Sequence, residues 1–113
     1  MPIFIKRIYE PADLQDGYRV LIDRLWPRGV KKEAVKIDLW LKGIAPTTKL
    51  RTWFNHDPAK WTEFQKMYRE ELKNNSAWKD LQHLARQHRT LTLLFAAKDE
   101  KHNHAILLSR LLK

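Results

Sequence analysis

The feature that most constrains the fold is the apolar run from Leu91 to Ala97, which contains one Thr and no charged residue. A short apolar run of this kind predicts a strand, and its lack of polar alternation predicts burial on both faces. Strands buried on both faces are typical of parallel sheets with helices packed over them. The run therefore favours an α/β layered fold. It is also far too short to cross a bilayer.

Two further strands are predicted near the start of the chain. Ile3–Tyr9 alternates apolar and polar residues after Phe4, and Tyr18–Leu25 is centred on three consecutive apolar residues. The second strand ends at a turn, because Pro27 lacks an amide hydrogen and Gly29 permits a positive φ. The next segment is predicted to form a helical turn and a short third strand, at Lys31–Lys36 and Asp38–Leu41.

Four helices are expected in the rest of the chain. Thr47 or Thr48 begins a short helix that ends at Phe54. Asp57-Pro58 begins the second, since Asp caps a helix and Pro at its first position loses no hydrogen bond. Ser76 is expected to cap a third helix, and the last runs from about His102 to Leu112. Apolar residues at helical spacing give the second helix a buried stripe of Trp61, Phe64, Tyr68 and Leu72.

The length of 113 residues suits one domain rather than two. Residues 1–113 are therefore expected to form a single small α/β domain. Its sheet is mostly parallel, with three or four strands flanked by about four helices, and the order of the strands is not specified. No cysteine occurs, which excludes disulfides and thiol catalysis. Neither a signal peptide nor a membrane span is recognised, so a cytoplasmic location is expected.

The charge balance is strongly basic, with 22 Lys and Arg against 13 Asp and Glu and a net charge of +9. The excess is spread over both halves of the chain, without a basic tail. Such a surface binds nucleic acid weakly and nonspecifically. A protein that reads nucleic acid more often gathers its Lys and Arg on one stripe. The charge alone therefore favours an ordinary basic surface.

A binding site is predicted at the carboxyl ends of the strands, where ligands bind in open α/β sheets. The three main strands end near Arg7, Asp23 and Lys98, and parallel strands bring such residues to one rim. Amides of the last helix point at the same rim and favour an anion there. We expect a cleft for a small anionic or sugar-bearing ligand. The candidate ligand-binding residues are Arg7, Arg24, Trp26, Arg28, Gly29, Trp53, Lys98 and Asn103.

The candidate acid–base groups are Asp23, Asp99, His102 and His56. Each has a structural alternative. Asp23 could form an ion pair with Arg24 or Arg28, Asp99 could cap the last helix, and His56 could be an ordinary loop histidine. Helical spacing places Asp99, His102 and Asn103 on one face and turns His104 toward the apolar core.

No metal or cofactor is expected. The two histidines of the His-x-His pair point apart on a helix, and no further ligand pattern supports them. The glycine-rich loops that bind dinucleotides or nucleoside triphosphates are missing, as are serine-nucleophile and zinc-protease motifs. A serine hydrolase and a dinucleotide enzyme are thereby disfavoured.

Several motifs in order resemble one known family. They are RVLIDRLWPRG (Arg19–Gly29), APTTKL (Ala45–Leu50), FNHDPAKW (Phe54–Trp61) and LLFAAKDEKHNHA (Leu93–Ala105). Together they resemble the YeaO-like family of small bacterial proteins, a domain of unknown function (number 488). The resemblance covers nearly the whole chain. It implies a bacterial cytoplasmic protein and points to the polar motif residues, among them His56, Asp99 and His102. It implies no particular reaction.

Three hypotheses of function follow. The first is an enzyme-like α/β domain that binds a phosphorylated or nucleotide-like ligand. Its anion is held by Arg7, Arg24, Arg28 and Lys98, its ring is covered by Trp26, and the acid–base groups handle protons. The second is a basic nucleic-acid-associated or regulatory module without catalysis. The third is a protein-interaction domain without a pocket. The sequence specifies neither the oligomeric state nor the ligand.

Overall fold

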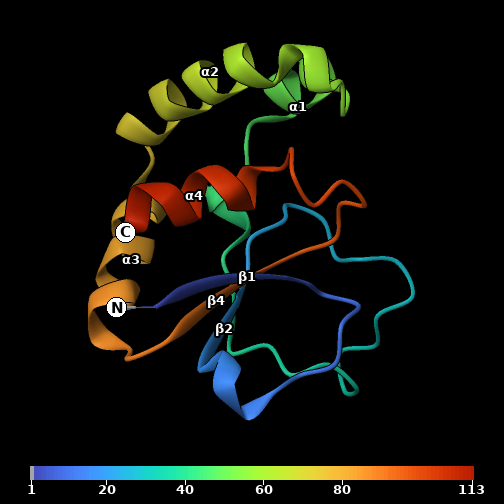
Figure 1. The fold of residues 1–113 in the computed structure, drawn as a ribbon, viewed down its shortest axis with the longest axis vertical. Coiled ribbons are helices and arrows are strands. Elements are labelled where there is room, and N and C mark those ends of the chain that lie inside the picture. The colour runs from blue at the N-terminus through green and yellow to red at the C-terminus, as the bar shows by residue number, and fades with distance from the viewer. Residues whose placement is uncertain (1) are drawn as a thin grey trace.

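A parallel sheet lies at the centre of the structure, a computed structural model that describes residues 2–113 (Figure 1). Its strands are β1 (Ile3–Arg7), β2 (Tyr18–Leu21), β3 (Leu39–Trp40) and β4 (Leu91–Phe95). They lie in the order β1-β4-β2-β3, and all neighbouring pairs are parallel. The long apolar run forms β4, whose residues are all buried. The predicted α/β fold with a parallel sheet is confirmed.

The strands end earlier than the sequence predicts. After Leu21, one more ladder bond joins the amide of Ile22 to a carbonyl of β4 at 3.1 Å. The carboxylate of Asp23 then accepts the amide of Ala96 at 2.9 Å, in place of a backbone carbonyl. A side chain therefore ends the pairing of β2 with β4 and turns the chain away from the sheet. The predicted ends, Tyr9 for β1 and Leu25 for β2, both lie beyond the observed strands.

Within the described residues the chain forms four α-helices, close to their predicted positions. They are α1 (Thr48–Phe54), α2 (Trp61–Lys73), α3 (Ser76–Gln87) and α4 (His104–Leu112). The Thr47 hydroxyl accepts the Leu50 amide at the start of α1. Asp57 caps a 3-10 turn, Pro58–Lys60, that leads directly into α2. None of these helices is long and apolar enough to cross a membrane.

Three local predictions need correction. Asn75, not Ser76, caps α3, because its extended backbone lets its side chain accept the Ala77 amide at 2.8 Å. The last helix begins at His104 rather than His102, since the residue before it is extended and acts as the cap. Within Lys31–Lys36 the predicted helical turn is limited to one hydrogen-bonded turn, from the Ala34 amide to the Lys31 carbonyl at 3.0 Å, and it does not continue as a helix.

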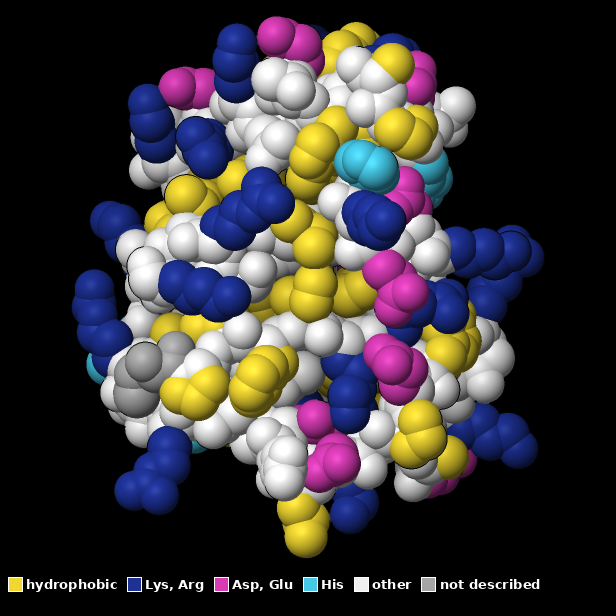
Figure 2. Space-filling model, viewed as in Figure 1, with side chains coloured by type: hydrophobic (Ala, Val, Ile, Leu, Met, Phe, Trp, Pro, Cys, Tyr) yellow, Lys and Arg dark blue, Asp and Glu magenta, His cyan; other side chains and the backbone are white. Residues whose placement is uncertain are grey.

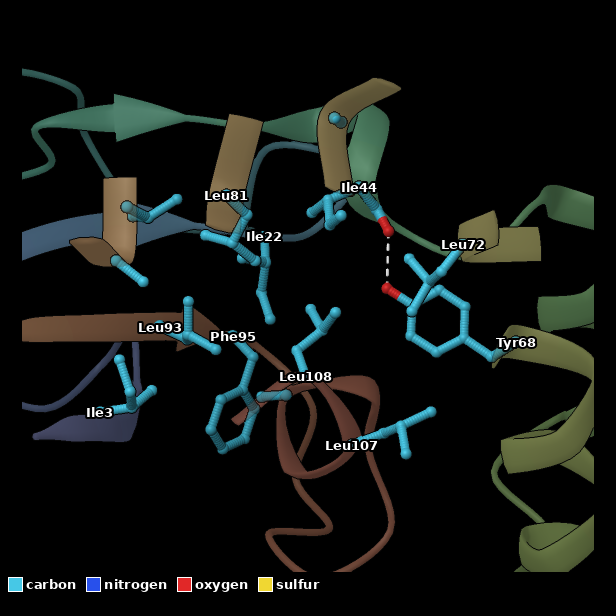
Figure 3. Close-up of a cluster of buried hydrophobic side chains, with 14 of the residues drawn as sticks. Ile3, Ile22, Ile44, Tyr68, Leu72, Leu81, Leu93, Phe95, Leu107 and Leu108 are labelled. Atoms are coloured by element: carbon cyan, nitrogen blue, oxygen red, sulfur yellow. Dashed lines mark hydrogen bonds between the residues drawn. The ribbon is translucent and has the colours of Figure 1, made fainter. Parts of the chain in front are cut away.

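The helices cover one face of the sheet (Figure 1). α4 packs on β1 and β4, and the α1–α2 hairpin lies above α4 in that view. Apolar side chains from the sheet and from all four helices form one buried cluster there, part of which is shown in Figure 3. The stripe predicted for α2 faces this cluster: Phe64, Tyr68 and Leu72 are buried, and Trp61 is partly buried.

Tyr68 ties α2 to the chain segment that precedes α1. Its ring is fully buried, and its hydroxyl donates to the carbonyl of Ile44 at 2.6 Å (Figure 3). Replacing Tyr68 with Phe keeps the ring and leaves this buried carbonyl without a donor. We expect Tyr68→Phe to lower the free energy of unfolding by about 1–2 kcal/mol. Urea denaturation checks this, and an unchanged midpoint would contradict it.

The opposite face of the sheet is covered by loops rather than helices. Leu21 and Leu94 are buried beneath the long segment that joins β2 to β3. Trp26 and Ile37 from that segment, together with Trp40 of β3, pack over them. The Trp40 indole N–H also donates to the carbonyl of Asp23 at 2.7 Å. This loop layer fixes the backbone at the point where β2 ends.

A buried ion cluster lies on the same face of the sheet. Asp16 accepts Lys6 Nζ at 2.9 Å, the Asp13 amide at 3.0 Å and the Arg19 guanidinium. Asp16 and Arg19 are both buried. Burial by itself raises the pKa of Asp16, but these hydrogen bonds outweigh it and hold the pKa below its ordinary value. One carboxylate thereby compensates two cations inside the protein.

Candidate functional site

A cleft of about 670 Å³ opens between the carboxyl ends of the strands and the α1–α2 hairpin. It is lined by the loop after β2, by the hairpin, and by the segment joining β4 to α4. Figure 2 shows histidine, basic and acidic side chains close together at the right of the view, below the upper helices. Ligands bind at this place in open α/β sheets.

Most of the predicted site residues lie in this cleft. Nine line it: Asp23, Arg24, Trp26, Arg28, His56, Lys98, Asp99, His102 and Asn103. They come from three parts of the chain that are distant in sequence. The predicted convergence of strand ends therefore occurs, since all the strands are parallel.

Asp23 and His104 form a pair at the base of the cleft. Besides accepting the Ala96 amide, the Asp23 carboxylate has its other oxygen 3.4 Å from His104 Nε2. The same nitrogen lies 3.0 Å from the carbonyl of Ile22. Burial raises the pKa of Asp23, although the charge of His104 and the bond from Ala96 act in the opposite direction. His104, predicted to turn toward the apolar core, also lines the cleft beside a carboxylate.

A second carboxylate–histidine pair lies in the loop before α4. Asp99 Oδ1 accepts the amides of Lys101 and His102 at 2.9 and 3.1 Å. Its other oxygen lies 2.9 Å from His102 Nδ1. These bonds, first that from the Lys101 amide and then that from the His102 ring, lower the pKa of Asp99. Asp99 therefore stays ionised near neutral pH. It shapes the turn and also orients the His102 ring.

His56 reaches the cleft from an unusual backbone conformation. Asn55 ends α1 in the left-handed region, at φ 44°, and His56 follows at φ 54°. Asn tolerates this region, whereas a histidine adopts it less often. Residues held in this way cluster at binding and catalytic sites. The FNHDP motif thus places an imidazole at the rim of the cleft.

Four cationic side chains line the cleft, against two carboxylates. Arg24 Nη2 donates to the carbonyls of Ala45 and Pro46, both at 3.1 Å, while its buried Nε has no partner among residues 2–113. Arg28, Arg51 and Lys98 are exposed. No salt bridge or side-chain hydrogen bond engages these three within the described chain. The cleft therefore offers three uncommitted cations.

Three predicted site residues do not line the cleft. Arg7 instead donates to the carbonyls of Ala97 and Ala96, at 3.0 and 3.2 Å, and so supports the cleft wall. Gly29 forms a turn at φ 73°. Trp53 lies on the outer side of α1, with Lys60 Nζ 5.1 Å from its ring centre. Asn103 does line the cleft, but its side chain accepts two amides and caps α4.

Sequence reasoning missed other residues that line the cleft. Arg51 projects from α1, and no local pattern shows which way that helix faces. Phe54 and Phe64 belong to core stripes and also form an apolar wall of the cleft. Tyr9 lines it as well, and its hydroxyl donates to the carbonyl of Arg28 at 3.0 Å. The prediction of parallel strands located the cleft at the strand ends, but it did not identify these lining residues.

The side chains of the cleft do not resemble a metal centre. Over residues 2–113, no group of three or more His, Asp or Glu side chains is placed to hold a metal ion. The two carboxylate–histidine pairs are each occupied by bonds within the pair and to the backbone. The arrangement can donate hydrogen bonds to an anion, accept them at histidine, and pack against an apolar group.

Comparisons with known proteins agree with the motifs. A family model described as "Inactive DUF488-N3 subclade" matches residues 2–113. The uncharacterised protein YeaO of Escherichia coli is 43% identical over 110 residues, which cover 96% of this chain and 95% of that protein. An uncharacterised protein of Mycobacterium tuberculosis is 37% identical over 108 residues, covering 96% of this chain and 91% of its own. No solved structure was found to match. The resemblance to YeaO-like proteins is thus confirmed, and the chain belongs to the DUF488 family, in the group described as its inactive N3 subclade.

Proposed function

We propose that the cleft binds a small anionic ligand, either phosphorylated or nucleotide-like. The observation that carries this proposal is the set of three uncommitted cations, Arg28, Arg51 and Lys98, around a largely apolar cleft. Guanidinium groups donate paired hydrogen bonds to phosphate oxygens, and Lys adds a point charge. Cations without internal partners at the mouth of a cleft are available to an anion from solution.

The walls of the cleft support a ligand with an apolar or planar part. Its volume, about 670 Å³, falls within the range of small-molecule sites. Phe54 and Phe64 stack with ring centres 4.4 Å apart and line one side. Trp26 lines the cleft too, and its indole N–H is fixed on the carbonyl of Val30 at 2.6 Å. A phosphate alone would leave these aromatic surfaces uncovered.

The proposal is one of binding rather than turnover. The family model that matches this chain carries the word "inactive" in its description, which favours a binding role. In this proposal Asp23, His104, Asp99 and His102 serve as hydrogen-bonding groups. The two carboxylate–histidine pairs can serve this role without catalysing a reaction.

Removing one uncommitted cation should weaken binding. We expect Arg28→Ala to reduce affinity for a phosphorylated ligand about tenfold, since a hydrogen bond to a charged group contributes about 1.5 kcal/mol or more. The measurement is a thermal-shift and calorimetric comparison of adenosine 5′-monophosphate, ribose 5-phosphate and inorganic phosphate with uncharged adenosine at low salt. A ligand at about a hundredfold excess over its Kd stabilises a protein by about 2.7 kcal/mol, which raises Tm by several degrees.

The matched control is Arg69→Ala, which removes an exposed arginine of α2 outside the cleft. Its binding should equal that of the wild type. Absence of a shift with every phosphorylated compound would contradict the proposal. A protein that binds nucleic acid through its overall charge would instead lose affinity equally in both variants and show a steep dependence on salt.

A further inference from the structure

The Asp99–His102 pair fixes which nitrogen of His102 carries the proton. Asp99 is ionised near neutral pH, so both its oxygens only accept hydrogen bonds. His102 Nδ1, 2.9 Å from Asp99 Oδ2, must therefore be the donor of that bond. In the neutral ring the other nitrogen, Nε2, is then an acceptor. The pair holds His102 in a single tautomer.

His102 Nε2 is a hydrogen-bond acceptor in a cleft whose cations are all donors. The ring lies edge-on to Trp61, with centres 5.6 Å apart, and its side chain is partly exposed. Within the described chain, Nε2 has no hydrogen-bond partner. By contrast Arg28, Arg51 and Lys98 offer only donors. The oxygens of Asp23 and Asp99 are already engaged by amides and imidazoles.

The fully ionised phosphate group of an ester cannot satisfy this acceptor. The dianion of a phosphate monoester accepts hydrogen bonds from the cations and has no proton to donate to Nε2. A hydroxyl group on the same molecule has both abilities. The lining therefore matches a ligand with an anionic end and a hydroxyl end.

We infer that His102, positioned by Asp99, makes the cleft selective for phosphate esters that also carry a free hydroxyl group, such as nucleotides and sugar phosphates. This inference rests on the proposed function and names its ligand class. Asp99 is the positioning residue, and His102 Nε2 is the group that accepts the hydroxyl proton in a hydrogen bond. No bond is made or broken in the ligand.

The first test uses ligand pairs that differ only in hydroxyl groups. Adenosine 5′-monophosphate is compared with its 2′,3′-dideoxy analogue, and glycerol 3-phosphate with propyl phosphate, at about pH 8. We expect the hydroxylated member of at least one pair to bind the wild type about fivefold more tightly, the usual effect of one hydrogen bond. His102→Phe should abolish the difference, and His102→Gln, whose amide oxygen accepts, should restore part of it.

The control is His83→Phe, at an exposed position on α3 outside the cleft, which should keep the wild-type preference. Equal binding of both members of each pair to the wild type would overturn this inference and leave the proposed function standing. Failure of every phosphorylated compound to bind would overturn both. An unchanged preference in His102→Phe would also overturn the inference.

The second test reads the tautomer directly and needs no ligand. In Asp99→Asn, the side-chain oxygen can still accept the backbone amides of Lys101 and His102. The side-chain NH₂ group then faces His102 Nδ1. The ring must then carry its proton on Nε2. Nitrogen-15 NMR of the imidazole should show the proton on Nδ1 in the wild type and on Nε2 in the variant. The variant should also lose the preference for hydroxylated ligands. A wild-type His102 with its proton on Nε2 would overturn the inference.

Discussion

Asp16→Ala is expected to lower the free energy of unfolding by about 3–5 kcal/mol, the usual cost of breaking a buried ion pair from one side. The variant leaves the buried Arg19 guanidinium without its carboxylate and removes the partner of Lys6 Nζ. It also frees the Asp13 amide from the capping box around the turn at Leu14–Asp16. A buried guanidinium without its carboxylate, and an ammonium left with only the Pro11 carbonyl, should destabilise the protein.

Urea denaturation of Asp16→Ala and of Asp80→Ala measures this effect. Asp80 is exposed on α3, so its replacement should change stability by less than about 0.5 kcal/mol. The low pKa of Asp16 adds a pH dependence. Its stabilisation is complete above the ordinary value near 3.8 and is lost as the pH falls through the lower value of the folded state. The gap between wild type and Asp16→Ala should therefore shrink below about pH 3.8. A loss under 1 kcal/mol at neutral pH would refute the role assigned to this cluster.

Phe64→Ala is the second change with a large expected effect. The Phe64 ring is 2% exposed and stacks on Phe54 and Trp61, with centres 4.4 and 5.6 Å away. Truncating a buried Phe costs about 3–5 kcal/mol, because transfer free energy is lost and a cavity remains. Since Phe64 also lines the cleft, the change should alter the shape of the cleft as well as the stability of the fold.

The matched control is Met67→Ala on the same helix, at a side chain that is 41% exposed. Met and Ala have similar helix propensities, so a small change is expected there. Chemical denaturation gives the stability of both variants. A ligand found with the panel described above should bind Phe64→Ala more weakly under conditions where the variant is folded. A destabilisation equal to that of Met67→Ala would show that the stacked rings do not hold the hairpin in place.

The fold was largely predictable because its strongest signals are local. The apolar run at Leu91–Ala97 specifies a buried strand whatever surrounds it, and Asp57-Pro58 specifies a helix start through capping alone. Strand ends were less predictable. Ile22 is apolar and still bonds to β4, yet the pairing stops after it because the Asp23 side chain accepts the amide of Ala96, the first residue after β4.

The candidate site was predictable in position but less so in detail. Helical spacing places Asp99 and His102 on one face, although the helix begins only at His104. The two residues are nevertheless adjacent, because the Asp99 carboxylate closes a turn onto the amide and ring of His102.

For Arg7, Arg51 and Trp53, contacts with distant parts of the chain determine whether the side chain lines the cleft. Arg7 lies at the end of β1 as predicted, but its guanidinium donates to the carbonyls of Ala96 and Ala97, which follow β4 and need hydrogen-bond donors. The orientation of α1 likewise brings Arg51 into the cleft and leaves Trp53 outside it. Neither outcome has a signature in the spacing of nearby residues.

The order of the strands also has a consequence for how the protein is made. β1 has β4 as its partner within the described chain, and β4 lies between β1 and β2 although it is the last strand to leave the ribosome. The first strand must therefore wait for about ninety residues to be translated before it can pair. Loop closure over that distance slows folding. The two strand pairs at the centre of the sheet, β1–β4 and β2–β4, can therefore form only after β4 has been made.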